Sequence, residues 1–354
     1  MPKKILMAGN IAIAEGAILA GCQAYFGYPI TPQNELLEHM AKRMPEEGRV
    51  FVQTESELAA ISMLYGAAAA GCRAMTSTSS PGFSLQQEGI SYMAGAELPA
   101  VLVNVMRGGP GLGNIGGAQG DYFQATKGGG HGDYRLINLA PASAQEMMDL
   151  TMLAFELADK YRNPVVLLTD GFLGQAMEPV IIRQPVTELP DKPWAITGAA
   201  GRPKNVINSF EMEPANFQPR VSLLLQKFER IKQNEVRYQG IHLDDASLVI
   251  VAYGSASRSA LTALKMARQK GLRVGLLRPI TLFPFPYQIL ADLAQKVSDF
   301  LVAELSSGQF IEDVKLAVGL DKRVELASQY GGVPLAPETI LETIERMSKV
   351  TIGR

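Results

Sequence analysis

Short apolar segments alternate with longer helical patterns from the start of this chain, and this alternation is the strongest constraint on its fold. The segments that predict strands are 4–7, 24–28, 49–53, 73–77, 100–105, 136–139 and 164–168. Helical patterns lie between them at 11–21, 32–43, 57–70, 83–94 and 144–160. Such alternation predicts an α/β fold with a mostly parallel sheet covered by helices on both faces. The strand at 164–168 is apolar throughout, as a sheet buried on both sides requires.

The character of the chain changes after Gly171. Residues 185–219 are rich in Pro, Asn and Gly and show little periodicity, and residues 221–238 form a charged amphipathic pattern. The alternation resumes at 246. We therefore expect a first domain at 1–185, a linker with a charged helix at 186–240, and a second, smaller α/β domain at 241–354. A length of 354 residues also favours two domains.

Composition excludes several functions. The net charge is −2 and the basic residues are dispersed, so nucleic acid is not an expected partner. No run approaches the roughly 18 apolar residues that a membrane span needs. The start of the chain predicts a first strand rather than a signal peptide, so we expect a cytoplasmic protein. Cys22 and Cys72 are the only cysteines, too few for an iron–sulfur cluster or a cysteine-based zinc site, and they are expected to be buried, inert thiols. The three histidines are too scattered for a metal site.

Polar turns follow several of the predicted strands. In a parallel sheet the carboxyl ends of the strands share one edge, and ligands bind there. Four turns carry candidate residues at this edge: 28–32 (Tyr-Pro-Ile-Thr-Pro), Glu57, 77–84, and Arg107. These side chains could therefore meet in one cleft.

Thr31 and Glu57 each have a structural interpretation as well as a functional one. Thr31 is predicted to cap a helix that has Pro32 in its first turn. The same helix end could also bind a carboxylate or phosphate. Glu57 could merely complement the dipole of its helix. Its position at the carboxyl end of a strand, with the small residues Ala59 and Ala60 nearby, also allows a buried carboxyl that could exchange a proton with a nitrogen heterocycle.

Arg107 opens a glycine-rich loop at 108–117. It could form a structural ion pair, or it could bind a carboxylate through paired hydrogen bonds. The loop lacks the Lys-Ser/Thr ending of a phosphate-binding P-loop. A mobile or interface-forming loop is the expectation.

The order of these motifs resembles the alpha subunit of 2-oxoacid:ferredoxin oxidoreductases, which use thiamine diphosphate and coenzyme A. The motifs that carry the resemblance are 28–32, 55–60 (Glu-Ser-Glu-Leu-Ala-Ala), 77–85, 107–110 and 130–133. The resemblance covers nearly the whole chain, because 278–284 and 304–309 are similar to the second domain of that family. Residues 108–117 and 127–134 are most similar to the branched-chain type, which acts on 3-methyl-2-oxobutanoate.

The resemblance implies a role for each candidate residue. Residues 1–185 would form the pyrimidine-type thiamine diphosphate-binding domain, and 241–354 a transketolase C-terminal-like domain. Glu57 would be catalytic, meeting N1′ of the aminopyrimidine, and Pro29 would form part of the cofactor wall. Thr31 and Arg107 would contact the substrate carboxylate. No metal ligand is expected in this chain.

The resemblance also implies an enzyme that converts a branched-chain 2-oxoacid and coenzyme A to acyl-CoA and CO₂ and reduces ferredoxin. The chain has no Gly-Asp-Gly motif followed by Asn for magnesium and diphosphate. A beta subunit would supply magnesium and diphosphate binding, and gamma and ferredoxin-like delta subunits would complete the complex with iron–sulfur clusters. The chain is therefore expected to be inactive alone.

Alternatives remain open at this stage. The substrate could be 2-oxoglutarate or an aromatic 2-oxoacid, or the chain could be a noncatalytic assembly subunit. A stand-alone nucleotide-binding enzyme is disfavoured, because the first strand is not followed by Gly-x-Gly-x-x-Gly. One departure stands out: the family commonly has Ser-Gly-Pro-Gly where this chain has Ser-Ser-Pro-Gly at 79–82. If that glycine requires a positive φ, Ser80 would be strained.

Overall fold

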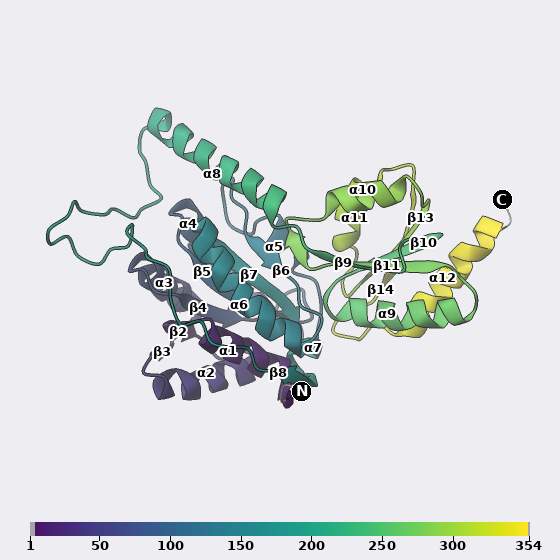
Figure 1. The fold of residues 1–354 in the computed structure, drawn as a ribbon, viewed down its shortest axis with the longest axis horizontal. Coiled ribbons are helices and arrows are strands. Elements are labelled where there is room, and N and C mark those ends of the chain that lie inside the picture. The colour runs from purple at the N-terminus through teal and green to yellow at the C-terminus, as the bar shows by residue number, and fades with distance from the viewer. Residues whose placement is uncertain (1–3, 353–354) are drawn as a thin grey trace.

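The first part of the protein is a seven-stranded sheet with the strand order β12-β6-β7-β5-β4-β2-β3 (Figure 1). The computed structural model describes residues 4–352, so residues 1–3 and 353–354 of the two expected domains lie outside the described residues. All neighbours in this sheet are parallel except β12, which runs antiparallel to β6. The strands are β2 (Ala24–Gly27), β3 (Val50–Gln53), β4 (Ala74–Thr78), β5 (Ala100–Met106), β6 (Ile137–Leu139), β7 (Pro164–Asp170) and β12 (Thr281–Phe283). The predicted α/β class is confirmed.

Helices cover both faces of this sheet (Figure 1). They are α1 (Gly9–Leu19), α2 (Asn34–Glu46), α3 (Glu57–Ala69), α4 (Ser80–Gly95), α5 (Tyr122–Thr126), α6 (Ala144–Tyr161) and α7 (Gly171–Gln175). Helix α1 packs on α2 and α6, and α3 packs on α4. The small residues of α3, mostly Ala and Gly, allow it to approach β2 and β4 closely.

The expected first strand exists but does not join the main sheet. β1 (Lys4–Ala8) pairs only with β8 (Met177–Ile181), in a separate antiparallel ribbon. Its first three residues are exposed, whereas the central strands are buried throughout.

The second part is a five-stranded sheet in the order β14-β13-β10-β11-β9. Its strands are β9 (Tyr238–Ile241), β10 (Leu248–Ala252), β11 (Val274–Pro279), β13 (Asp299–Glu304) and β14 (Arg323–Ser328). Its helices are α9 (Gly254–Gln269), α10 (Tyr287–Ala294), α11 (Phe310–Val318) and α12 (Pro337–Ile352). Only β9 runs antiparallel to its neighbour among the described strands of this sheet.

The connecting segment includes a long helix, α8 (Pro214–Asn234). It begins earlier than the predicted 221, because Pro214 provides a favourable first helical residue. It also ends earlier than 238, where the chain enters β9. The irregular stretch before α8 extends away from the sheet as a projecting arm (Figure 1).

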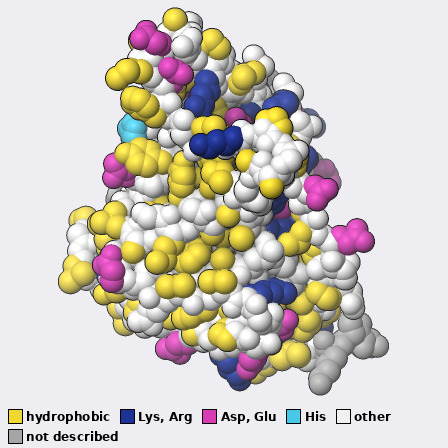
Figure 2. All heavy atoms as spheres, turned by 90° about the vertical axis from the view of Figure 1, so that its left-hand side faces the viewer, with side chains coloured by type: hydrophobic (Ala, Val, Ile, Leu, Met, Phe, Trp, Pro, Cys, Tyr) yellow, Lys and Arg dark blue, Asp and Glu magenta, His cyan; other side chains and the backbone are white. Residues whose placement is uncertain are grey.

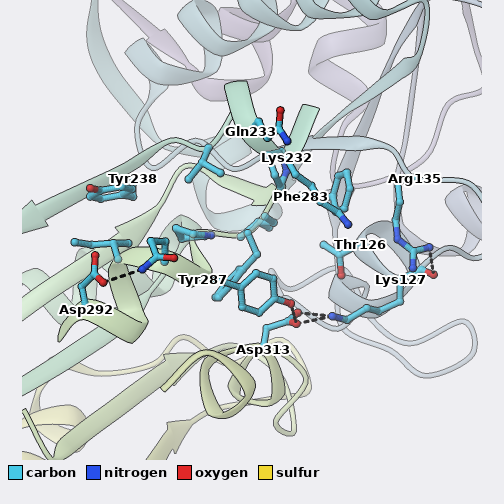
Figure 3. A pocket seen from close by; sticks show the side chains of 17 residues that line it. Thr126, Lys127, Arg135, Lys232, Gln233, Tyr238, Phe283, Tyr287, Asp292 and Asp313 are labelled. Carbon is cyan, nitrogen blue, oxygen red and sulfur yellow. Dashed lines mark hydrogen bonds and ion pairs between the residues drawn. The ribbon is translucent and has the colours of Figure 1, made fainter. Parts of the chain in front are cut away.

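A buried carboxylate fixes the two parts against each other. Asp313 in α11 accepts a hydrogen bond from the Tyr122 hydroxyl at 2.5 Å. It also accepts from the Tyr287 hydroxyl and pairs with Lys127 Nζ, each at 2.5 Å (Figure 3). Tyr122 and Lys127 come from the first part of the chain. The Gln119 side chain adds two hydrogen bonds across the junction, to the backbone of Tyr253 and Leu305, and its backbone N–H donates to the Leu305 carbonyl. The cleft between the two parts therefore has a defined shape.

Candidate active site

The polar turns gather at the carboxyl edge of the parallel sheet, as the strand pattern predicts. Arg107 follows β5 and its Nη1 donates to the carbonyl oxygen of Thr31, after β2, at 2.9 Å. The Arg107 backbone N–H donates to Ser80 Oγ, after β4, at 3.0 Å. Glu57 follows β3 and is the first residue of α3. The structure thus brings Thr31, Ser80 and Arg107 together.

The prediction that Thr31 caps α2 is wrong. The helix begins at Asn34, the Thr31–Pro32 peptide is cis, and no side chain caps the helix. Gln33 closes the turn instead, since it donates to the Tyr28 carbonyl at 3.3 Å and accepts from Ser77 Oγ at 2.6 Å. Thr31 is exposed on this turn, as is Pro29.

Arg107 is buried without an acidic partner. Its Nη2 donates to the Leu112 carbonyl at 3.1 Å, and its Nε is buried with no hydrogen-bond partner. Among residues 4–352, no carboxylate lies within ion-pair distance of this guanidinium, so the simple ion-pair interpretation does not hold. Two carbonyl groups orient the charge without neutralising it. An anion would therefore bind favourably here.

Ser80 belongs to a hydrogen-bonded cluster and is not strained. It is the first residue of α4 and has no positive φ, so the expected strain is absent. Its Oγ donates to Asp121 Oδ2 at 2.6 Å. Asn104 Nδ2 donates to the same oxygen at 2.9 Å, and Asn104 Oδ1 accepts from the Ser80 N–H at 3.0 Å. Burial raises the pKa of Asp121 above its ordinary value, although these hydrogen bonds and Arg107 oppose the shift.

Asp121 and Asn104 were not identified as candidates from the sequence. Asn104 interrupts an otherwise apolar strand, which is a signal that could have identified it. Asp121 lies in a loop with no periodicity, and only the tertiary structure places it beside Ser80.

The Glu57 carboxyl is buried but has no hydrogen-bond partner among the described residues. Ser56 caps α3 by accepting from the Ala59 N–H at 3.3 Å, and Glu57 is only 5% exposed. Within residues 4–352 the carboxyl makes no hydrogen bond or ion pair. It lies against Gly82 of α4, where a β carbon would be 2.3 Å from Oε1. Thr78 Oγ1, which is buried and has no partner, would be 2.0 Å from the same β carbon.

A cleft of about 540 Å³ lies between the two parts of the chain beside Arg107. The loop at 108–117 forms part of its wall and is held by hydrogen bonds, including one from Asn114 Nδ2 to the Gly331 carbonyl at 2.8 Å. The lining residues are Ser80, Pro81, Ser84, Arg107, Gly109, Pro110, Gly111, Ala118, Gly120, Asp121, Leu305, Ser306, Ser307, Gln309, Tyr330 and Gly331. Asp121 and Arg107 therefore share one cleft.

A second pocket of about 650 Å³ lies on the other side of α5, between α8 and α10 (Figure 3). Lys127, Arg135, Phe283 and Tyr287 are among its lining residues. The candidate site residues Pro29, Thr31, Glu57 and Arg107 do not line it.

Other predicted features also have a place in the structure. Cys22 is buried, and burial raises the pKa of its thiol to about 12, whereas Cys72 is only half-buried. In the described part of the chain no cluster of His, Cys, Asp and Glu could hold a metal ion. No described helix is long and apolar enough to cross a membrane.

Comparison with known proteins identifies the family. The model described as pyruvate flavodoxin/ferredoxin oxidoreductase, thiamine diphosphate-binding, matches residues 15–217. Core domain II of pyruvate:ferredoxin oxidoreductase matches residues 246–340. The chain therefore belongs to the 2-oxoacid:ferredoxin oxidoreductase family, as a subunit with a thiamine diphosphate-binding domain. The resemblance seen in the sequence is confirmed.

Individual relatives narrow the comparison. Ketoisovalerate oxidoreductase subunit VorB of Methanothermobacter thermautotrophicus is 53% identical over 97% of both chains. The 2-oxoglutarate synthase subunit KorA of the same organism is 37% identical over 99% of this chain and 100% of the relative.

Solved structures agree with the fold. The 2-oxoglutarate:ferredoxin oxidoreductase from Magnetococcus marinus, with 2-oxoglutarate, coenzyme A and succinyl-CoA bound, superposes with a TM-score of 0.88 at 26% identity. The match covers 98% of this chain and 65% of that chain. A split gene transketolase shares the fold at a TM-score of 0.56 and 14% identity, over 96% of this chain and 95% of that one.

Proposed function

We propose that the chain acts in an enzyme that oxidatively decarboxylates 3-methyl-2-oxobutanoate with coenzyme A, giving the acyl-CoA and CO₂ and reducing ferredoxin. The observation that carries this proposal is the buried Glu57 carboxyl, which has no partner in the described chain and lies against Gly82. The choice of a branched substrate is supported by the 53% identity to a ketoisovalerate oxidoreductase subunit, against 37% for a 2-oxoglutarate synthase subunit.

The residues around Glu57 fit thiamine diphosphate. A buried, unpartnered carboxyl suits a nitrogen heterocycle that needs a proton exchanged at a ring nitrogen. Glu57 would hold the aminopyrimidine in this way, and the exposed Pro29 would contribute to the wall beside it. When bound, the cofactor supplies an electron sink for the electrons left by decarboxylation.

Arg107 and Thr31 would bind the 2-oxoacid. The guanidinium is oriented by the carbonyls of Thr31 and Leu112, while Nε remains free. A substrate carboxylate that meets the guanidinium from the cleft would neutralise this buried charge. Thr31, whose carbonyl accepts from Arg107, would add its hydroxyl as a donor to the substrate.

Partner subunits complete this proposal. Leu58 and Met63 on α3, and Leu85 and Tyr92 on α4, are exposed apolar side chains on two adjacent helices. Figure 2 shows the side of the molecule that lies at the left in Figure 1, where hydrophobic side chains spread over the middle and acidic ones lie mainly near the edges. We assign a docking role to α3 and α4 for a beta subunit that brings magnesium and diphosphate binding. Gamma and delta subunits would carry the iron–sulfur clusters, and the complex would be cytoplasmic.

The domain division at 185 and 240 belongs to the same proposal. The first family match runs past 185 to residue 217, and the two matches leave residues 218–245, which include most of α8, between them. β12, at Thr281–Phe283, extends from the second part into the first sheet, so the division by sequence and the division by sheet differ there.

The test uses the complex assembled by co-expression with the partner subunits. Glu57→Gln keeps the shape and removes the ionisable carboxyl, so we expect turnover to fall by at least a hundredfold. Glu55→Gln is the matched control, because Glu55 is exposed and bonded only to Ser56. Dye reduction would be measured with 3-methyl-2-oxobutanoate, 2-oxoglutarate and pyruvate.

Each result decides a separate part of the proposal. If kcat/KM is highest with the branched acid, both the proposed chemistry and the proposed substrate are supported. A preference for 2-oxoglutarate would keep the chemistry and overturn the substrate. Full activity of Glu57→Gln in a cofactor-loaded complex would instead favour the assembly-subunit alternative.

A further inference from the structure

A second ionisable group lies in the cleft that contains Arg107. Asp121 lines this cleft, and Ser80 and Asn104 hold its Oδ2 through two hydrogen bonds of 2.6 and 2.9 Å. The proposed chemistry uses Glu57, Arg107 and Thr31 and leaves Asp121 without a role. A half-buried carboxylate held by two polar side chains beside an unpaired guanidinium needs a physical account.

We propose that Asp121 is a positioning residue of the substrate site, whose charge sets how strongly Arg107 binds an anionic substrate. The inference rests on the proposed role of Arg107 in binding the 2-oxoacid carboxylate. Ser80 links the two residues, because its Oγ donates to Asp121 and accepts from the Arg107 backbone N–H at 3.0 Å.

The hydrogen bonds fix the position of Asp121 independently of its charge. Both donors, Ser80 Oγ and Asn104 Nδ2, reach the same oxygen. An asparagine at position 121 could present its amide oxygen to both donors. Asp121→Asn therefore removes the charge and keeps the cluster, which allows the two effects to be measured separately.

The charge of Asp121 acts on Arg107 and on the substrate in opposite senses. It attracts the guanidinium, and it repels a carboxylate bound to that guanidinium. The anionic form of Asp121 should therefore weaken substrate binding, and the protonated form should strengthen it.

Few other charges surround this group in the described chain. Arg107 and the buried Tyr253 phenol are the titratable groups that interact with Asp121. Tyr330 lines the same cleft from the second part of the chain. Glu304 lies behind the turn at 305–309, where its carboxylate is bonded by Ser306 Oγ and by the N–H groups of Gln309, Phe310 and Ile311.

The pH dependence follows from these charges. Burial raises the pKa of Asp121, so its proton is lost closer to neutral pH than that of an exposed aspartate. Affinity for the 2-oxoacid should be highest below this pKa and should fall as the pH rises through it.

The experiment compares Asp121→Asn with the unchanged protein in the assembled complex. KM and kcat for 3-methyl-2-oxobutanoate would be measured from pH 5 to pH 8.5, and binding of the acid to the cofactor-free complex would be followed by calorimetry. We expect KM and the dissociation constant of Asp121→Asn at pH 8 to be lower by about threefold or more, with kcat much less changed. The difference between the two proteins should narrow toward the acid end, as Asp121 takes up its proton.

Two further variants test the role of Asp121 separately from the role of Arg107. Ser80→Ala breaks the link and removes a hydrogen bond that lowers the pKa of Asp121, so the pH dependence of KM should persist but shift to higher pH. Arg107→Gln should raise KM strongly, and if it does not, the proposed role of Arg107 is wrong. If Arg107→Gln raises KM but Asp121→Asn leaves KM and its pH profile unchanged, the role of Asp121 alone is overturned. Thermal unfolding of each variant confirms that it folds.

Discussion

The Glu57 carboxyl and Gly82 are in such close contact that a β carbon at position 82 would lie 2.3 Å from Oε1. Such a distance is impossible for real atoms, so the hydrogen at Gly82 allows the start of α3 to meet the first turn of α4. Gly82 does not have a positive φ. The glycine is therefore required by close approach, and this explains the Gly of the 79–82 motif.

Gly82→Ala should displace the Glu57 carboxyl. The added methyl group overpacks the site, which costs about 1–3 kcal/mol of unfolding free energy, and turnover should fall with it. Gly66→Ala on α3 is the matched control, because no atom lies within 4 Å of its β carbon position. A helical Gly→Ala change of that kind stabilises by about 0.5–1 kcal/mol. Urea unfolding and dye reduction measure both effects, and an active Gly82→Ala variant would contradict the expected displacement.

Thr78→Val should stabilise the chain and impair the enzyme. The Thr78 hydroxyl is buried without a partner, and such a group costs about 1–3 kcal/mol. Valine has a similar shape and removes that cost. The hydroxyl also lies beside Glu57, so its loss should lower turnover, while Thr78→Ser should retain activity. Unfolding and turnover are measured together, and a Val variant that is both less stable and fully active would refute this account.

The sequence predicted the elements of the fold whose residue pattern is local and repeats along the chain. The central strands β2, β5 and β7 could be located from their apolar runs, and the carboxyl edge of the sheet then followed from parallel topology. Glu57, Ser80 and Arg107 lie at that edge for this reason.

Features that depend on distant partners could not be predicted in the same way. β12 has only three residues and is a strand because it pairs with β6, more than a hundred residues away. Thr31 has the pattern of a helix cap, but the hydrogen bonds of Gln33 move the start of the helix. Asp121 has no local signal, since its neighbours Ser80 and Asn104 come from other elements.

Glu15 should make stability depend on pH at the acid end. Its Oε1 lies 2.6 Å from His39 Nε2 and accepts from Arg43 Nε at 3.1 Å, and the hydrogen bond with His39 is the main cause that lowers the pKa of Glu15. A lowered pKa in the folded state stabilises the protein above the unfolded pKa, and the contribution is lost as the pH falls through the folded value. Glu15→Gln should thus cost about 1 kcal/mol at pH 7 and less at pH 3. Urea unfolding at both pH values tests this, with Glu46→Gln, an exposed partner of Arg43, as the control. An equal cost at both pH values would show that the charge is not the cause.

Asp313→Ala should loosen the junction between the two parts of the chain. The change leaves the hydroxyls of Tyr122 and Tyr287 and the Lys127 ammonium without their shared acceptor, which should cost about 3 kcal/mol. Lys127→Ala, in which a half-exposed side chain is removed, should cost less than about 1 kcal/mol. Unfolding would be followed by circular dichroism and by the fluorescence of Trp194, the single tryptophan, which packs under Arg162 of the first part. Because α5 directly follows Asp121, we also expect KM for the 2-oxoacid to rise in Asp313→Ala. Unchanged unfolding and unchanged KM would mean that the other junction contacts, such as those of Gln119, fix the cleft without this carboxylate.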